Sequence, residues 1–590
     1  MKKSWKKSIK IGVSLLLVLC TVFGNFTVAF AAGDKGTIKY VSLGDSMTNG
    51  YAMSSGYTND NQGFQNTAAD IYPTQFKDYL EQKGYTVDFY QYAMSAFRAE
   101  ELRFLLNQPE NWNQMPLAGR WRDVQETWES VFDYGDGWTY TQFTGYNKRF
   151  PKIFGDPNCL ASYDLVNWVL TGTENAVSTY SAAVKDADLI SMAYGNAGMG
   201  AFCMQYLLDA LDNISDIPNL KNELKLDRQI AQLDPELAEK VTSLQSDVEA
   251  KLKSVLSQYL DEATADYINY LIYVITYALV SHAVNYTGAL GDIARVNEKD
   301  NLEIISFPII NAFNGVELYI NDSVTIPLEE VYGLLLKPVN DYMEKLPTML
   351  KLKNPALFEG ITFYFAEVGT IDSVSNHYDD IHNNTIMRER VFTTVVGTES
   401  SPGRFWGLMQ TPFSGFGGLK YVTLDEVRAY ENDPASLTGS SEDEIKMKQL
   451  ACAVYLGYEE GIVNSTKDGY ITADTLLAIR DIGSLFAPAV EALVAPVTNW
   501  ASGTGDLNTI TSSLSTALVN DTKLNSLCNI YARFMIGDGM GKHPSAEGHQ
   551  QLAEIIIDTY DVEDNAIVSI LKAFFNVFLK VWQKIVGLFN

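Results

Sequence analysis

The feature that most constrains this chain is a short apolar segment that stops abruptly at Gly44-Asp45-Ser46. Residues 38–43 are rich in β-branched and aromatic side chains, and such a run before a turn predicts a buried strand. A glycine at the end of the strand gives the backbone freedom to bend. A serine after that bend lies at the carboxyl edge of a sheet, where open α/β folds bind ligands. The tripeptide is common and is usually only a turn, so Ser46 needs a partner elsewhere.

A candidate partner lies almost at the other end of the chain. His543-Pro544 is followed by His549 and a helix-like segment at 550–560. Ester hydrolysis by serine needs a base that takes the hydroxyl proton and later returns it, and a near-neutral imidazole can do both. His543 is therefore the candidate base. The Gly-Asp-Ser segment and this His-Pro segment together resemble the SGNH (GDSL) hydrolase superfamily.

The resemblance implies a three-layer α/β/α fold, flavodoxin-like, with a parallel sheet of about five strands. It implies an acyl-enzyme mechanism that needs no cofactor and no metal. Ser46 would be the nucleophile and His543 the base, and the oxyanion hole would consist of the Ser46 and Ala96 amides and the Asn196 side chain. The family's aspartate, three residues before the histidine, is replaced here by methionine. Asp538 is the candidate to orient His543, and a backbone carbonyl is the alternative.

The two middle motifs depart from the family pattern. Gln91 stands where the family has asparagine, Ala96 where it has glycine, and Ala197 where it has aspartate after Asn196. The Ala96 amide can still donate a hydrogen bond, because every residue except proline keeps its N–H. An ordinary strand-to-helix turn at 91–98 remains the alternative interpretation.

The segments between these motifs alternate between strand-like and helix-like patterns, as expected for parallel strands joined by helices. Further strands are predicted at 85–92, 186–194, 301–310 and 361–368, and helices at 73–83, 99–106 and 174–184.

We expect one hydrolase domain at 32–562, with insertions at about 107–180, 199–300 and 369–527. The first insertion is rich in tryptophan, which suits either a substrate cleft or the insertion's own core. In the second, 235–260 and 267–286 have the apolar periodicity of packed helices. The latter is short for a membrane span and is interpreted as a core or lid helix.

Residues 1–31 have the pattern of a secretory signal peptide, with lysines before an apolar run and Ala29-Phe30-Ala31 as the cleavage site. Lipidation at Cys20 is the alternative, although Leu19 is bulky for that signal. Removing the signal would take the formal net charge from −28 to −33, because it holds five lysines and no acid. We therefore expect a secreted protein whose acidic surface repels nucleic acid.

Two groups of possible ligands remain open. The four cysteines after the signal peptide are widely spaced, so both disulfides and buried thiols are possible. The segment 377–382 combines two histidines with two aspartates and could hold a divalent metal, although such side chains are more often simply solvated.

The last segment, 565–590, forms an amphipathic helix pattern. Polar residues and lysines occupy about a third of the helix circumference, and Phe and Trp side chains share the rest. A helix of this kind lies in a lipid interface, covers an apolar groove on its own protein, or pairs with a second copy.

These observations predict a secreted serine ester hydrolase of the esterase or lipase type, with a small-molecule or lipid ester as its substrate and possible contact with a membrane surface through 565–590. The alternatives are a carbohydrate O-deacetylase and a non-catalytic surface or membrane-binding protein that kept the fold.

Overall fold

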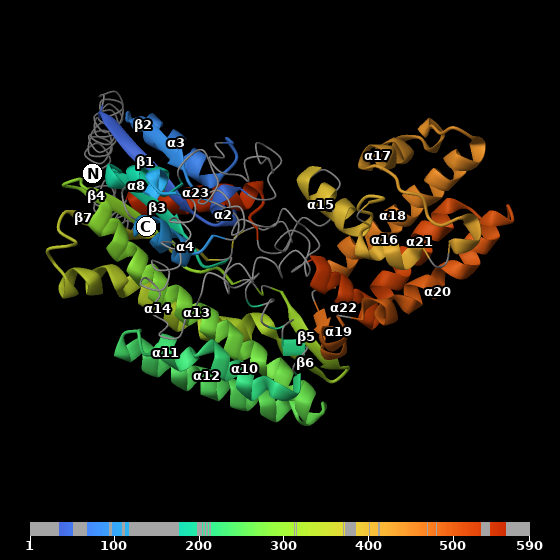
Figure 1. The fold of residues 1–590 in the computed structure, drawn as a ribbon, viewed down its shortest axis with the longest axis horizontal. Coiled ribbons are helices and arrows are strands. Elements are labelled where there is room, and N and C mark those ends of the chain that lie inside the picture. Colours follow the sequence, from blue (N-terminus) through green and yellow to red (C-terminus); the bar gives the residue numbers. More distant parts are fainter. Residues whose placement is uncertain are drawn as a thin grey trace, which may run out of the picture.

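The structure is a computed structural model, shown in Figure 1. It describes residues 35–50, 68–93, 97–108, 112–116, 176–196, 203, 207, 210–211, 214–311, 313, 315–369, 371, 385–400, 402–410, 413–468, 470–479, 481–532 and 543–561. The predicted signal peptide, the predicted helix at 565–590 and the cluster at 377–382 lie outside these residues.

A parallel five-stranded sheet forms the centre of the α/β body, as the sequence predicts. Its strand order is β2-β1-β3-β4-β7, and every neighbouring pair is parallel. β4 and β7 end earlier than the predicted strands at 301–310 and 361–368. The strands are β1 (Thr37–Gly44), β2 (Thr86–Gln91), β3 (Leu189–Ala193), β4 (Leu302–Ser306) and β7 (Ile361–Phe365).

Helices cover both faces of this sheet (Figure 1). Successive side chains of a strand point to opposite faces, so Tyr40 of β1 packs with α3 (Tyr72–Gln82) and α23 (Ala546–Tyr560). Val41 faces the other core, with α4 (Ala99–Leu106) and α8 (Ala176–Lys185). The central strand β3 is buried along its whole length for this reason, as a parallel strand covered on both faces is. The arrangement is compatible with α/β/α layering.

The second predicted insertion forms a group of helices on one side of the sheet. Its longest member, α13, is a buried core helix that begins after the Asp261 cap and packs against α4. Among the described residues, two helices are long and apolar enough to cross a membrane, α13 and α20. Most of the apolar stretch of α13 is buried inside the protein, and a third of that of α20 is buried. The helices of this insertion are α10 (Ile217–Leu224), α11 (Leu226–Ile230), α12 (Pro235–Leu256) and α13 (Glu262–Val296). Helix α14 (Leu328–Lys353) follows the insertion, between β4 and β7 in the chain, and packs against α12 and α13. Helix α20 is Ile482–Ala501.

A second, small sheet connects this body to a helical lobe (Figure 1). β5 (Glu317–Asn321) pairs with β6 (Val324–Pro327) and also with β8 (Tyr470–Thr472), which comes from the third predicted insertion. Sequence patterns did not predict this sheet. Besides α20, the lobe contains α15 (Thr385–Val395), α16 (Arg404–Met409), α17 (Leu424–Asn432), α18 (Glu442–Asp468), α19 (Ala473–Ala478), α21 (Leu507–Asn520) and α22 (Thr522–Ile530).

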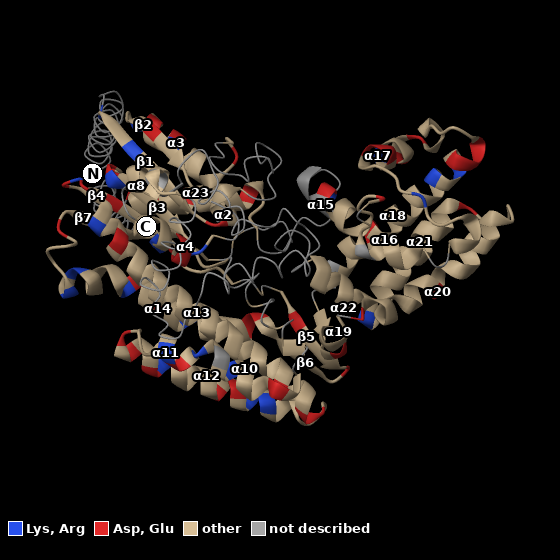
Figure 2. Cartoon of the chain, in the orientation of Figure 1, with Lys and Arg blue, Asp and Glu red and all other residues tan. Residues whose placement is uncertain are grey.

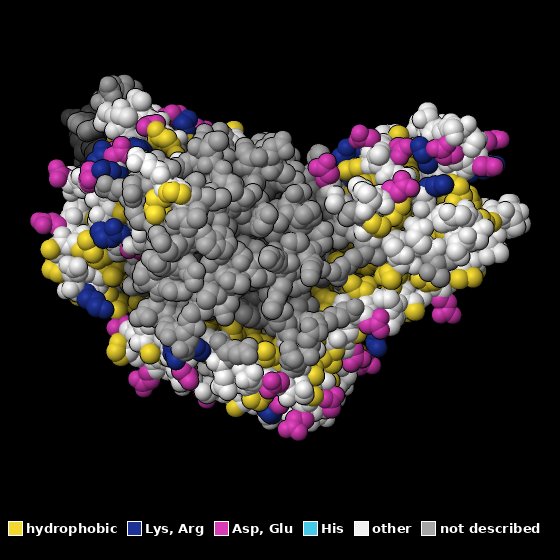
Figure 3. Space-filling view, viewed as in Figure 1, with side chains coloured by type: hydrophobic (Ala, Val, Ile, Leu, Met, Phe, Trp, Pro, Cys, Tyr) yellow, Lys and Arg dark blue, Asp and Glu magenta, His cyan; other side chains and the backbone are white. Residues whose placement is uncertain are grey.

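Charged side chains are spread over the outer helices. Figure 2 shows acidic residues on α3, α11, α12 and α17, whereas α20 is almost uncharged. Figure 3 shows hydrophobic side chains on the visible face of the helical lobe. Val494 and Phe416 of this lobe are exposed. Cys203, Cys452 and Cys528 are buried, and Cys452 and Cys528 are free thiols.

Candidate active site

The turn after β1 places Ser46 at the start of the short helix α2 (Ser46–Asn49). A side chain at Gly44 would come within 2.7 Å of the Ala193 carbonyl oxygen and would collide with Thr48, so only glycine fits. The Asp45 carboxylate accepts a hydrogen bond from the Met47 amide at 3.1 Å and caps the helix. Ser46 is the first helical residue, where backbone N–H groups have no partner within the helix.

The structure brings Ser46 and His543 together across 497 positions of sequence. The Ser46 Oγ atom lies 2.7 Å from the His543 Nε2 atom, which is hydrogen-bonding distance. The side chains are 5% and 2% exposed, respectively. With Nε2 unprotonated, the imidazole accepts the hydroxyl hydrogen, which is the arrangement that general-base catalysis needs.

His543 lies just before α23, which packs against α3 and β7. The Ser545 hydroxyl caps α23 by accepting from the Gly548 amide at 3.1 Å. His549, in the first turns of this helix, accepts a hydrogen bond at Nδ1 from the Tyr72 amide at 3.3 Å. The Tyr72 hydroxyl in turn bonds the Thr48 hydroxyl of α2 at 2.8 Å.

His549 is fully buried, and its pKa lies at about 3 because burial disfavours the charged ring, with the nearby His543 lowering it further. A neutral His549 suits a structural role in this buried position. It links the helix after His543 to the helix that begins with Ser46.

Asn196 follows β3 at the same edge of the sheet as Ser46. Gly44 and Ala193, the last residues of β1 and β3, are partners in the ladder between these strands. Ser46 follows Gly44 by two residues, and Asn196 follows Ala193 by three. The Asn196 Oδ1 atom accepts from the Ile310 amide at 3.1 Å. Because the oxygen is engaged there, the Nδ2 group is the donor that remains for another partner.

The other predicted site residues, Ala96 and Asp538, lie outside the described residues. Their roles therefore stay predictions. The described part of the chain contains no group of three or more His, Cys, Asp or Glu side chains arranged to hold a metal ion.

Sequence reasoning missed the role of Gln91, which it treated only as a departure from the family pattern. Its Nε2 atom donates to the Thr48 carbonyl at 2.9 Å, and its Oε1 atom accepts from the Ala93 amide at 2.7 Å. The Asn49 side chain also donates to the Ala93 carbonyl at 2.9 Å. Gln91 therefore connects the serine helix to the segment that leads to Ala96.

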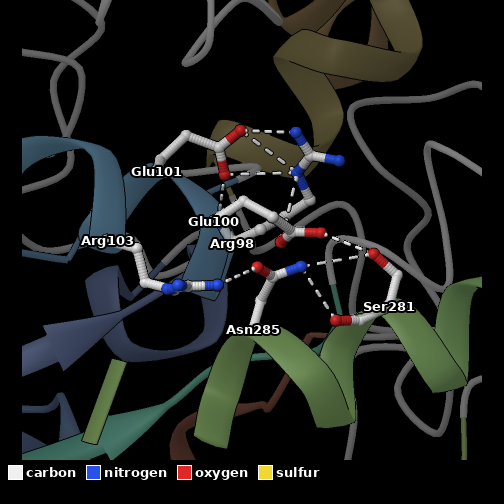
Figure 4. A network of polar contacts seen from close by, with 6 residues as sticks. All are labelled: Arg98, Glu100, Glu101, Arg103, Ser281 and Asn285. Carbon is white, nitrogen blue, oxygen red and sulfur yellow. Dashed lines mark hydrogen bonds and ion pairs between the residues drawn. The ribbon is translucent and has the colours of Figure 1, made fainter. Parts of the chain in front are cut away.

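A buried polar network, which the sequence also did not reveal, holds the start of α4 (Figure 4). Arg98 donates to the Glu101 carboxylate at 2.6 Å, and burial raises the Glu101 pKa against the lowering effect of this guanidinium. The Ser281 hydroxyl of α13 donates to Glu100 at 2.9 Å. Arg103 donates to Asn285 of α13 at 2.8 Å. The helix that follows the Ala96 segment is thus tied to the helical insertion.

Comparisons with known proteins add no assignment to this geometry. A scan against protein-family models, a search of curated proteins and a search of solved structures each found no match.

Proposed function

We propose that this chain is a secreted serine ester hydrolase, similar in mechanism to the SGNH superfamily. The observation that supports it most is the 2.7 Å contact between the Ser46 hydroxyl and the His543 ring. Serine becomes nucleophilic when an adjacent base can take its proton, and here the base lies in hydrogen-bond reach at the carboxyl edge of a parallel sheet. Buried surroundings strengthen electrostatic interactions at the reacting atoms.

The proposed cycle has two halves. The Ser46 Oγ atom attacks the ester carbonyl carbon while its proton moves to His543 Nε2, and a tetrahedral oxyanion forms. The C–O bond to the leaving group breaks, and His543 returns the proton to the departing alcohol. Water then attacks the acyl-Ser46 ester with His543 again taking a proton, and the carboxylic acid and free serine are released.

Three donors are proposed to stabilise the oxyanion. They are the Ser46 amide at the start of α2, the Ala96 amide, and the Asn196 Nδ2 group. The start of a helix suits a negative charge because its first N–H groups are unpaired. Asp538, or a backbone carbonyl, would orient the His543 ring; a missing orienting carboxylate lowers the rate more than it abolishes activity.

The proposed substrates are acyl esters, those of lipids included, encountered outside the cell. The motivation is the lysine-edged apolar pattern at 565–590, together with the secretory pattern at 1–31. Co-sedimentation with liposomes, with and without residues 565–590, tests the lipid component. Equal binding by both forms would remove it and leave the ester hydrolase proposal intact.

The enzymatic proposal is tested by covalent labelling and turnover. Wild-type protein should react with a fluorophosphonate probe at Ser46 and hydrolyse short or long nitrophenyl esters or acetylated glycans. Ser46→Ala should abolish labelling, and His543→Ala should lower turnover by about 10⁴-fold or more.

Ser191→Ala is the matched control, because this buried serine lies within β3 and bonds Tyr40 at 2.8 Å. It should label like the wild type. If folded wild-type protein and Ser46→Ala are equally inert on all these probes, the chain is not a serine hydrolase, and a binding protein with this fold becomes the better description.

A further inference from the structure

Helix α14 contacts the Ile309-Ile310 segment, which bonds the Asn196 side chain. Asn340 of α14 makes two hydrogen bonds to the backbone of Ile309: its Oδ1 atom accepts from the amide at 3.0 Å, and its Nδ2 atom donates to the carbonyl at 2.9 Å. Two bonds from one planar amide fix both the position and the orientation of this peptide unit. The next amide along, that of Ile310, donates to the Asn196 Oδ1 atom at 3.1 Å.

The Ile310 bond determines which end of the Asn196 side chain is available. Only the Oδ1 atom of Asn196 can accept a hydrogen bond from a backbone N–H group, so the Asn196 amide cannot rotate by half a turn without losing this bond. Its Nδ2 group is therefore held on the other side. A shift of the Ile309-Ile310 segment would move or release that donor.

The same segment also packs against the turn before Asn196. Gly195 has a φ of +119°, and a Cβ atom there would lie 2.7 Å from the Ile309 side chain and 3.1 Å from the His282 ring of α13. His282 is buried, and among the described residues its Nε2 atom has no hydrogen-bond partner. Ile309 and His282 therefore pack against the backbone of Gly195, the residue before Asn196.

We propose that Asn340 is a positioning residue for the Asn196 donor, acting through the backbone of Ile309 and Ile310. This inference rests on the ester hydrolase function proposed above. It assigns α14 a purpose in the proposed site, because α14 supplies the bonds that orient an oxyanion donor. Rigid support of this kind matters because a misplacement of about 1 Å can cost about 100-fold in rate.

The test is a double-mutant cycle on ester turnover by the full chain. Asn340→Ala should lower kcat about 10- to 100-fold and leave KM unchanged, because Asn196 would act on the transition state alone. Asn196→Ala should lower kcat by about 10²- to 10³-fold. Adding Asn340→Ala to Asn196→Ala should cause no further loss, because the donor that Asn340 positions is already absent.

Asn297→Ala is the matched control. Asn297 also holds backbone by its side-chain amide, donating to the Val184 and Ala187 carbonyls at 2.7 and 3.0 Å. It lies before the amino end of β4, whereas Asn196 follows the carboxyl end of the parallel strand β3, at the opposite edge of the sheet. It should lower stability without lowering kcat. An unchanged kcat in Asn340→Ala, or an equal loss in the wild-type and Asn196→Ala backgrounds, would overturn the positioning role.

A second readout does not depend on activity. Hydrogen exchange of the peptide that contains Ile309 and Ile310 should become faster in Asn340→Ala and stay unchanged in Asn297→Ala. Unchanged exchange in Asn340→Ala would overturn the inference even in an active enzyme. An inert wild type with faster exchange in Asn340→Ala would instead refute the proposed function and leave the structural link from Asn340 to Ile310 established.

Discussion

His549 should make the folded protein sensitive to mild acid. Its ring is fully buried, accepts a hydrogen bond from the Tyr72 amide, and has a pKa of about 3. In the unfolded chain the pKa of histidine is about 6.5. Because the folded pKa is lowered, the unfolded state binds the proton first, so the stability that neutral His549 contributes is present above about pH 6.5 and is lost as the pH falls toward about 3.

The size of the effect follows from the two pKa values. At about pH 5 the unfolded histidine is almost fully protonated and the folded one almost fully neutral. Linkage then lowers the free energy of unfolding by about 2 kcal/mol between about pH 8 and about pH 5 for this one residue. Such a loss is a large part of the stability of a typical folded domain.

The perturbation is His549→Gln, because glutamine can still accept from the Tyr72 amide but does not titrate. Urea unfolding at about pH 8 and about pH 5 should show that the acid-induced loss in the variant is smaller than in the wild type by about 2 kcal/mol. Tyr72→Phe is the control. It removes the hydroxyl bond to Thr48, and because burial raises the Tyr72 pKa well above its usual value, it should lower stability equally at both pH values.

The reasoning is refuted if His549→Gln loses as much stability between the two pH values as the wild type does. That result would mean that the buried ring already carries its proton in the folded state.

Two further predictions concern the helices outside the site. Arg388→Met should lower the free energy of unfolding by about 3–5 kcal/mol. The reason is that it leaves the fully buried Glu459 carboxylate without the guanidinium that bonds it at 2.8 Å. The double variant Arg388→Met with Glu459→Gln should recover most of that loss, as measured by urea unfolding. Gly457→Ala should destabilise the protein by about 1–3 kcal/mol, because the new Cβ atom would lie 2.8 Å from the Thr511 carbonyl where α18 crosses α21. Gly291→Ala in α13 has open space around it and should stabilise the protein by about 0.5–1 kcal/mol. Thermal unfolding of both variants separates the effect of packing from that of helix propensity.

The central sheet and the Ser46–His543 contact could be predicted because their signals are local. A buried parallel strand is a short apolar run, and the segments before Ser46 and after His543 each carry a turn and the start of a helix. The predicted helix at 267–286 was too short, because α13 extends through polar ends to Glu262 and Val296. The apolar pattern reports the buried middle of a helix, whereas its ends depend on caps such as Asp261.

Helix α14 shows why other elements could not be predicted. Pro338 and Pro347 lie inside it, and proline inside a helix removes a hydrogen bond and usually ends or bends it. Packing of buried residues such as Leu335 and Met343 against the body compensates for those losses. The second sheet was missed for a related reason, because β8 is three residues long and pairs with a strand about 150 positions earlier.

Gln91 extends this argument to the site itself. As a sequence feature it is a mismatch to the asparagine of the family pattern and weakens that resemblance. In the fold its longer side chain bonds both the Thr48 carbonyl and the Ala93 amide, so the helix of Ser46 and the segment toward Ala96 are held by one residue. A buried amide costs stability unless both of its ends are paired, and here the two partners belong to the serine helix α2 and to the segment after β2. Replacing Gln91 by a shorter side chain would therefore remove the bonds that hold these two segments in register.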